Sequence, residues 1–144
     1  MAIAQMSWGR MRHDPDDARV KEFMDSLATV YADAGAHPGF IWRMDDTEAA
    51  KQVSDLGFDT RMAATVSVWK DVEALFDYSF SGRHGQYFDR RKDWFETVEG
   101  PQLVIWNVAA GDRPDFVEAF ERLEMLKTQG PTEAAFGWPD SMRK

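Results

Sequence analysis

Residues 102–108, QLVIWNV, alternate like a β-strand but carry apolar side chains on both faces of that strand. One face would hold Val104, Trp106 and Val108, and the other Leu103 and Ile105. A sheet that leaves one face in water alternates apolar and polar residues more cleanly. The chain must therefore cover both faces of its sheet, and a second copy of the same sheet is the simplest cover for the second face. We expect a homodimer that forms through an open sheet face.

Three more segments have the two-residue alternation of strands, and these are residues 2–11, 40–44 and 62–69. The predicted helices are, in chain order, one from the N-cap Asp14 to Gly35, one over 72–80 after Asp71, one over 82–98, and one between Asp115 and Gly130. This order contains the βαββαβ unit of a ferredoxin-like sandwich. We expect one α+β domain over residues 1–144, with an antiparallel sheet, helices on one face and an extra C-terminal helix.

Two segments do not fit this scheme directly. Residues 45–60 are acidic and weakly patterned, which predicts a long loop, with one helical turn at most, of the kind that often serves as a mobile flap. The C-terminal segment carries Phe136 and Trp138 and is too apolar to be a free tail, so we expect it to dock on the domain.

Composition excludes several classes of function. The net charge of −8 repels phosphate backbones, and the densest basic run, 90–92, is flanked by aspartates, which argues against nucleic-acid binding. The absence of cysteine removes disulfides, thiolate nucleophiles and cysteine-ligated metals, and the three histidines lack metal-site spacing. Neither a signal peptide nor a membrane span is recognisable, and the first helix is too acidic for anionic membranes, which predicts a cytoplasmic protein without a membrane partner.

The segment 82–98, GRHGQYFDRRKDWFETV, is the place where the residue types favour a functional site. Read as a helix, it places His84, Tyr87 and Arg91 on one buried stripe with Trp94 or Phe95. A stripe meant only for packing would be aliphatic, because buried polar groups cost free energy when they are left unpaired. The stripe is therefore expected to form one wall of a small-molecule pocket.

Each of these side chains also has a purely structural explanation. His84 suits acid–base catalysis near neutral pH, but a core histidine bound to a backbone carbonyl fits the pattern too. Arg91 could bind an anion or form an internal salt bridge. Tyr87 could donate a proton or simply pack with its hydroxyl in water.

Five further residues are candidates for ligand binding. Arg43 lies in the middle of a predicted strand, where a ligand, an edge position or a dimer contact would explain its charge equally well. Tryptophans could form an aromatic wall for a flat ligand, or belong to the core and the dimer interface; the candidates are Trp42, Trp69, Trp94 and Trp106.

Several motifs together resemble a bacterial domain-of-unknown-function family placed among the dimeric α+β barrels, beside the antibiotic-biosynthesis monooxygenases. The most specific are the His-x(6)-Arg-x-x-Trp-Phe run at 84–95 and the Trp-x(4)-Gly-x-x-Pro run that begins at Trp106 and leads into a helix at 118–123. The resemblance covers nearly the whole chain. It implies a ferredoxin-like monomer, a sheet-to-sheet dimer and a pocket between sheet and helices.

The resemblance implies no single reaction, since the superfamily holds oxygenases, haem enzymes, isomerases and non-catalytic members. A monooxygenase of this type needs no cofactor: His84 would deprotonate an aromatic or polyketide-type substrate that itself reduces dioxygen, and Tyr87 and Arg91 would stabilise the anion. A haem variant would use His84 as the axial ligand. The alternative is a non-catalytic, dimeric ligand-binding or structural domain.

Overall fold

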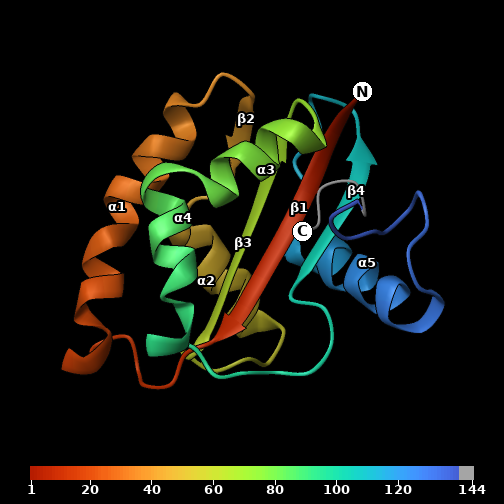
Figure 1. Cartoon of the computed structure of the whole chain (residues 1–144). Helices are drawn as coiled ribbons and strands as arrows, with labels where there is room; N and C mark the ends of the chain where they lie inside the picture. The colour runs from red at the N-terminus through yellow and green to blue at the C-terminus, as the bar shows by residue number, and fades with distance from the viewer. Residues whose placement is uncertain (140–144) are drawn as a thin grey trace.

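The computed structural model describes residues 1–139, apart from the Arg83 side chain, and shows one four-stranded antiparallel sheet with helices on both of its faces (Figure 1). The strands are β1 (Ala2–Arg10), β2 (Phe40–Arg43), β3 (Met62–Trp69) and β4 (Leu103–Val108). Their order in the sheet is β2-β3-β1-β4. The helices are α1 (Lys21–Ala36), α2 (Asp46–Asp55), α3 (Val72–Phe80), α4 (Gly82–Asp89) and α5 (Phe116–Gln129).

This strand order is that of a ferredoxin-like sandwich, so the predicted α+β fold with an extra C-terminal helix is confirmed. Each of the four strands begins and ends within one residue of its predicted bounds. The caps follow the sequence as well, because the carboxylates of Asp71 and Asp115 accept hydrogen bonds from the backbone N–H groups of Ala74 and Glu118.

The prediction that helices lie on one face only is wrong. One face of the sheet, with Ile3, Trp69 and Ile105, packs against α1 and α3. The other face, which includes Ala4, Val66 and Trp106, is covered by α2 and α5 of the same chain. In Figure 1, α3 and α4 accordingly lie in front of the strands and α2 behind them. The open face from which the homodimer was predicted is therefore filled by the chain itself.

Ten of the residues 45–60 form a helix, α2 (Asp46–Asp55), where the sequence predicted a long loop with one helical turn at most. The Asp45 carboxylate caps α2 by accepting from the Glu48 N–H at 2.9 Å. Ala49 and Val53, four residues apart, are the two buried positions of this ten-residue helix, and both pack into the core on the second face. Two apolar residues spaced four apart are enough to stabilise a short helix when that helix packs against a sheet and α5.

The predicted helix over 82–98 is also shorter in the structure. Helix α4 ends at Asp89, and after a 3-10 turn at Arg91–Asp93 the chain becomes extended. It then pairs with the end of β1: the Arg12 N–H donates to the Trp94 carbonyl and the Glu96 N–H to the Arg10 carbonyl, both at 2.8 Å. Long-range backbone pairing therefore replaces the last helical turns.

The start of the first helix differs from the prediction, whereas the C-terminal segment agrees with it. The first helix begins after Asp17, which caps a 3-10 turn at Ala18–Val20, and not at Asp14. The C-terminal segment docks as predicted, because Phe136 exchanges two backbone hydrogen bonds with Ile105. Trp138 packs against Phe76 and Phe80 of α3. No helix in residues 1–139 is long and apolar enough to cross a membrane.

Candidate functional site

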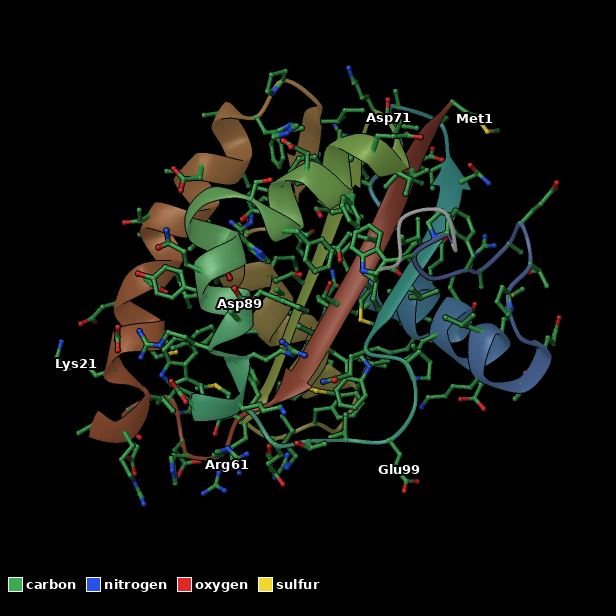
Figure 2. All side chains as sticks on the ribbon, in the orientation of Figure 1. Met1, Lys21, Arg61, Asp71, Asp89 and Glu99 are labelled. Atoms are coloured by element: carbon green, nitrogen blue, oxygen red, sulfur yellow. The ribbon has the colours of Figure 1, made fainter. Side chains whose placement is uncertain are left out.

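An open cavity of about 720 Å³ is lined by the first sheet face and the helices α1, α3 and α4, and it extends to residues of α2, among them Asp46, Ala49 and Val53. This volume falls within the roughly 300–1,000 Å³ of typical small-molecule sites. Its lining is mainly apolar and aromatic and includes Phe23, Met24, Leu27, Val30, Trp69 and Tyr78. Figure 2 draws the side chains on these elements, with Arg61 at the end of the sheet where β3 begins.

His84 lines the cavity from α4. Its Nδ1 atom lies 2.8 Å from the Ser79 carbonyl oxygen, which can only accept, so Nδ1 carries the proton in the neutral ring. Within the described residues Nε2 has no hydrogen-bond partner. Burial lowers the pKa of His84, and the bond to Ser79 only partly opposes this effect. The ring is therefore held neutral, with Nε2 as an unused proton acceptor.

The ring of Tyr78 packs against the His84 imidazole. The two ring centroids lie 4.7 Å apart, and the Tyr78 hydroxyl donates to the Val30 carbonyl at 3.0 Å. Burial raises the pKa of Tyr78 well above its ordinary value, so this donor stays protonated. Tyr78 also stacks on Trp69 at 5.1 Å, which links His84 to the floor of the cavity through aromatic contacts.

Tyr87 and Arg91 lie on the same side of the cavity as His84, as the sequence spacing predicts. Tyr87 is half-buried against Trp94, with ring centroids 6.0 Å apart. Arg91 is exposed, lies over the Phe88 ring and donates to the Phe88 carbonyl at 2.9 Å. Among residues 1–139, Arg91 forms no salt bridge.

Arg43 reaches the cavity from the edge strand β2. Its guanidinium lies 3.6 Å from the centre of the Tyr31 ring and donates to the Asp46 carboxylate at 2.7 Å. Burial raises the pKa of Tyr31, and Asp46 adds to this effect while Arg43 opposes it. Arg43 therefore has an internal anion and is less available to a ligand than Arg91.

The four candidate tryptophans separate into two groups. Trp69 and Trp94 are buried and line the cavity. Trp42 and Trp106 belong to the core on the opposite sheet face, between the strands and the helices α2 and α5. The alternation within a strand explains this split, because Trp106 pairs with Ala4 whereas Trp69 pairs with Ile3. We therefore leave Trp42 and Trp106 out of the candidate site.

A row of polar side chains on the sheet, absent from the sequence-based candidates, forms the floor of the cavity. Gln5 and Ser67 are only 5% and 7% exposed, and with Ser7 and Thr65 they occupy the cavity face of β1 and β3. In the sequence these residues appear merely as the polar positions of two strands. The polar row can be recognised only when β1 and β3 are known to be neighbouring strands in which Gln5 pairs with Ser67.

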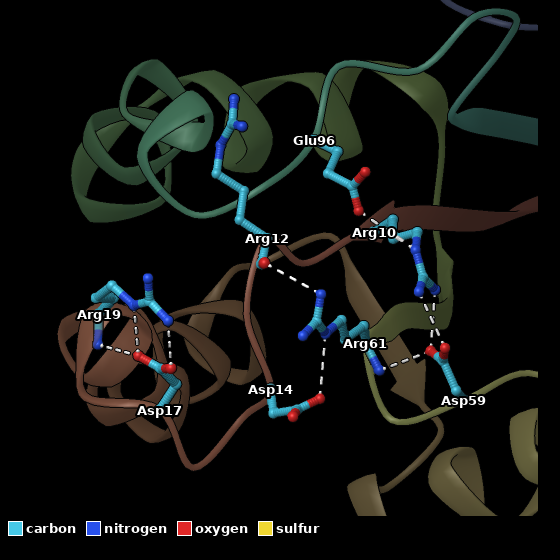
Figure 3. A network of polar contacts seen from close by, with 8 residues as sticks. All are labelled: Arg10, Arg12, Asp14, Asp17, Arg19, Asp59, Arg61 and Glu96. Carbon is cyan, nitrogen blue, oxygen red and sulfur yellow. Dashed lines mark hydrogen bonds and ion pairs between the residues drawn. The ribbon is translucent and has the colours of Figure 1, made fainter.

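The end of the cavity near the C-terminus of β1 is surrounded by a polar network (Figure 3). Arg10 forms a bidentate pair with Asp59, at 2.9 and 3.0 Å, and contacts Glu96 at 3.3 Å. Arg61 pairs with Asp14 at 3.1 Å. The Arg10 guanidinium lowers the pKa of Asp59. These bonds tie the β1–α1 connection, the start of β3 and the 94–97 segment into one rim.

Three cations at this rim lack an anionic partner among residues 1–139: Arg12, Arg91 and Lys92. Arg12 instead donates to the Lys92 carbonyl at 2.8 Å. Arg91 and Lys92 line the cavity directly. Within the same residues, no cluster of His, Asp or Glu has the composition of a metal site. The rim can therefore attract an anionic group even though the whole chain is acidic.

Comparisons with known proteins agree with the fold. A family model described as a domain of unknown function (DUF3291) matches residues 2–144. The structure is similar to a conserved protein from Methanosarcina mazei Go1, with 15% sequence identity and a TM-score of 0.52 over 73% of this chain and 90% of that chain. SnoaB, a cofactor-independent oxygenase from Streptomyces nogalater, is 11% identical with a TM-score of 0.49, over 75% of this chain and 93% of SnoaB. No curated protein matches the sequence.

Proposed function

The chain belongs to the DUF3291 family, whose function is unknown, and we propose that it is a small-molecule enzyme whose ligand lies in the cavity between the sheet and helices α1, α3 and α4. The observation that carries the proposal is the state of His84. A neutral imidazole in a mainly apolar cavity, with an Nε2 atom that has no hydrogen-bond partner among the described residues, is the arrangement that a general base requires.

The lining indicates the class of ligand. Trp69, Trp94 and Phe23 offer flat apolar surfaces to an aromatic or polyketide-type ring system. Tyr87 and Arg91 line the same cavity as His84, and there a hydroxyl and a cation would stabilise an anion formed by proton removal. Arg43 contributes less, since it is paired with Asp46. The catalytic group of this proposal is therefore His84, with Tyr87 and Arg91 in support.

Cofactor-independent oxygenation is the specific reaction that we propose. His84 Nε2 removes a proton from an acidic C–H group of the substrate, and the resulting carbanion transfers its electrons to dioxygen. For anthrone, a tricyclic ketone with an acidic methylene group, the balanced outcome is anthraquinone and one water from one dioxygen. No electron donor besides the substrate is required for this reaction.

Anthrone separates the two parts of this proposal. Under nitrogen in D₂O, the protein should accelerate deuterium exchange at the methylene carbon, and His84→Asn should reduce that acceleration by about 100-fold or more. In air, the same comparison of quinone formation tests the oxygenase step. His37→Asn is the matched control, because His37 is held by Asp77 at 2.9 Å outside the cavity lining. Exchange at the buffer rate would refute the catalytic role of His84.

Two alternatives use the same site. A haem iron would need the free Nε2 of His84, while Arg91 and Lys92 at the rim suit the carboxylates of the group; titration with haemin would then produce a Soret band that His84→Asn abolishes. A non-catalytic binding protein would bind aromatic ligands without accelerating exchange. The ion pair between Arg43 and Asp46 favours this second alternative, because it leaves one cation fewer to stabilise an anion formed during catalysis.

The homodimer remains part of the proposal, supported by the family resemblance. Because α2 and α5 cover the second sheet face, the partner would contact these helices and not the strands. Three exposed apolar residues lie on or directly after these helices: Val117 on α5, and Leu56 and Phe58 directly after α2. Association through this surface would leave the cavity on the other face of the sheet accessible in each subunit.

A further inference from the structure

The polar row on the cavity floor is a connected hydrogen-bond chain. The Gln5 amide Nε2 donates to Ser67 Oγ at 2.8 Å, and more weakly to Thr65 Oγ1 at 3.4 Å. Ser7 Oγ donates to Gln5 Oε1 at 2.5 Å. The indole Nε1 of Trp69 also donates to Ser67 Oγ, at 2.9 Å. Gln5 and Trp69 thus contact the Ser67 hydroxyl, and Ser7 and Thr65 contact the Gln5 amide.

The short contact of Ser7 fixes the orientation of the Gln5 amide. A distance of 2.5 Å is normal for an O–H···O bond but too short for an N–H···O bond. The amide oxygen therefore faces Ser7, and the amide nitrogen faces Ser67. Since Nε2 is only a donor, Ser67 must accept this bond.

Counting donors and acceptors leaves one group unused. A serine hydroxyl has two lone pairs and one proton. Both lone pairs of Ser67 are occupied, one by Gln5 Nε2 and one by Trp69 Nε1. No acceptor for the Ser67 proton exists among residues 1–139, although the side chain lines the cavity and is 7% exposed. The hydroxyl is a donor with a single remaining direction, away from its two partners.

We propose that the Ser67 hydroxyl donates a hydrogen bond to an oxygen atom of the ligand, and that this ligand is an aromatic ketone or its enolate. This inference rests on the proposed function and deepens it. A hydroxyl that already accepts two N–H bonds is polarised and donates more strongly. Thr65 lines the cavity as well, and its hydroxyl accepts the weak bond from Gln5 while keeping a proton that could be donated to the ligand.

The arrangement has a chemical consequence. When a base removes a proton from the carbon skeleton of an aromatic ketone, negative charge accumulates on the carbonyl oxygen. A donor held in place before the reaction stabilises that charge without reorganisation. Ser67 is held by Gln5 and Trp69, so Gln5 is a positioning residue and Ser67 the group that touches the ligand.

Fluorenone and fluorene test this assignment, because they share one tricyclic skeleton and differ by a carbonyl oxygen. We expect Ser67→Ala to weaken fluorenone binding about 3- to 10-fold, the effect of one hydrogen bond, and to leave fluorene binding unchanged. Ser26→Ala is the matched control: Ser26 is equally buried and lines the same cavity, but its proton is already donated to the Phe23 carbonyl at 2.6 Å. It should not distinguish the two probes.

The outcomes separate this inference from the proposed function. Equal losses for both probes in Ser67→Ala, or equal losses of fluorenone in both serine variants, would overturn the role of Ser67 and leave the cavity as a binding site. If the wild-type protein binds neither probe, both proposals fail. Should Ser67→Ala not fold, the infrared carbonyl stretch of fluorenone bound to the wild type decides: a frequency below that in hydrocarbon solvent supports the hydrogen bond, and an unchanged frequency refutes it.

Discussion

His84 donates a hydrogen bond from Nδ1 to the carbonyl oxygen of Ser79, at 2.8 Å. Ser79 precedes His84 by five positions in the sequence, and the bond crosses the break between α3 and α4 at Ser81. The left-handed backbone at Gly82, with φ of 56°, allows the chain to change direction directly after this break. One bond therefore fixes both the orientation of the ring and the atom that faces the cavity.

The buried state of His84 should make stability depend on pH. Because burial lowers its pKa in the folded protein below the unfolded value of 6.5, the unfolded chain binds the proton first on acidification. Stability is then lost as the pH falls below about 6.5, until the folded ring is also protonated. The amide side chain of the variant His84→Asn cannot titrate but can still donate a hydrogen bond.

Urea unfolding at about pH 7.5 and pH 5 measures this effect. The wild type should lose more free energy of unfolding between the two conditions than His84→Asn, because all other titrating groups are common to both. The same loss in both proteins would show that His84 has an ordinary pKa.

The close approach of α3 and α4 predicts a second effect. A methyl group at Gly85 would lie 2.7 Å from the Phe80 carbonyl oxygen, which is backbone and cannot move independently. Gly85→Ala should therefore lower the free energy of unfolding by about 1–3 kcal/mol. Gly35→Ala is the control, since nothing lies within 4 Å of a methyl group there in helix α1, and it should gain about 0.5–1 kcal/mol. Thermal or urea unfolding of both variants measures these changes. A Gly85→Ala variant as stable as the wild type would contradict the predicted steric clash with Phe80.

Arg91 has no anionic partner within residues 1–139, and this predicts that the cavity favours anionic ligands. Arg91→Gln should weaken binding of fluorenone-2-carboxylate about 2- to 5-fold at low salt, the effect of an exposed ion pair, and leave fluorenone unaffected. The difference should disappear at high salt. Arg90→Gln removes the same charge, but Arg90 is committed to Glu22 at 2.6 and 2.8 Å. Equal effects of the two variants would mean that only the overall charge matters.

The outer surface of α2 and α5 predicts the site of association. If the chain is a homodimer through this surface, Val117→Lys should shift the mass in light scattering from dimer to monomer, because it places a charge on a residue that is 53% exposed in one chain. Thr128→Lys, with the same charge change on the same exposed helix, should leave the dimer intact. A monomeric wild type would refute the homodimer.

Features with a local cause could be predicted from the sequence. The strands follow from their two-residue alternation, and the caps at Asp71 and Asp115 from short-range hydrogen bonds. Helix α2 had the same Asp-x-x-Glu signal at residues 45–48, but it has only two buried apolar residues, Ala49 and Val53. Its stability comes from packing on the sheet and α5, which a local pattern cannot show.

Features with a tertiary cause could not be predicted. Trp94 and Phe95 fit helical spacing from His84, yet backbone pairing with β1 removes them from the helix. The grouping of His84, Tyr87 and Arg91 survives because all three lie within or directly after α4. The role of Ser67 depends on Gln5, sixty-two residues away, so only the strand register reveals it.

A crystal structure of the protein soaked with fluorenone would decide whether the cavity is a ligand site. We expect ligand density in the cavity between the sheet and helices α1 and α4, with the carbonyl oxygen within hydrogen-bond distance of Ser67 Oγ and the rings beside His84 and Trp69. A cavity closed by side chains, or ligand bound only outside it, would contradict the proposed site.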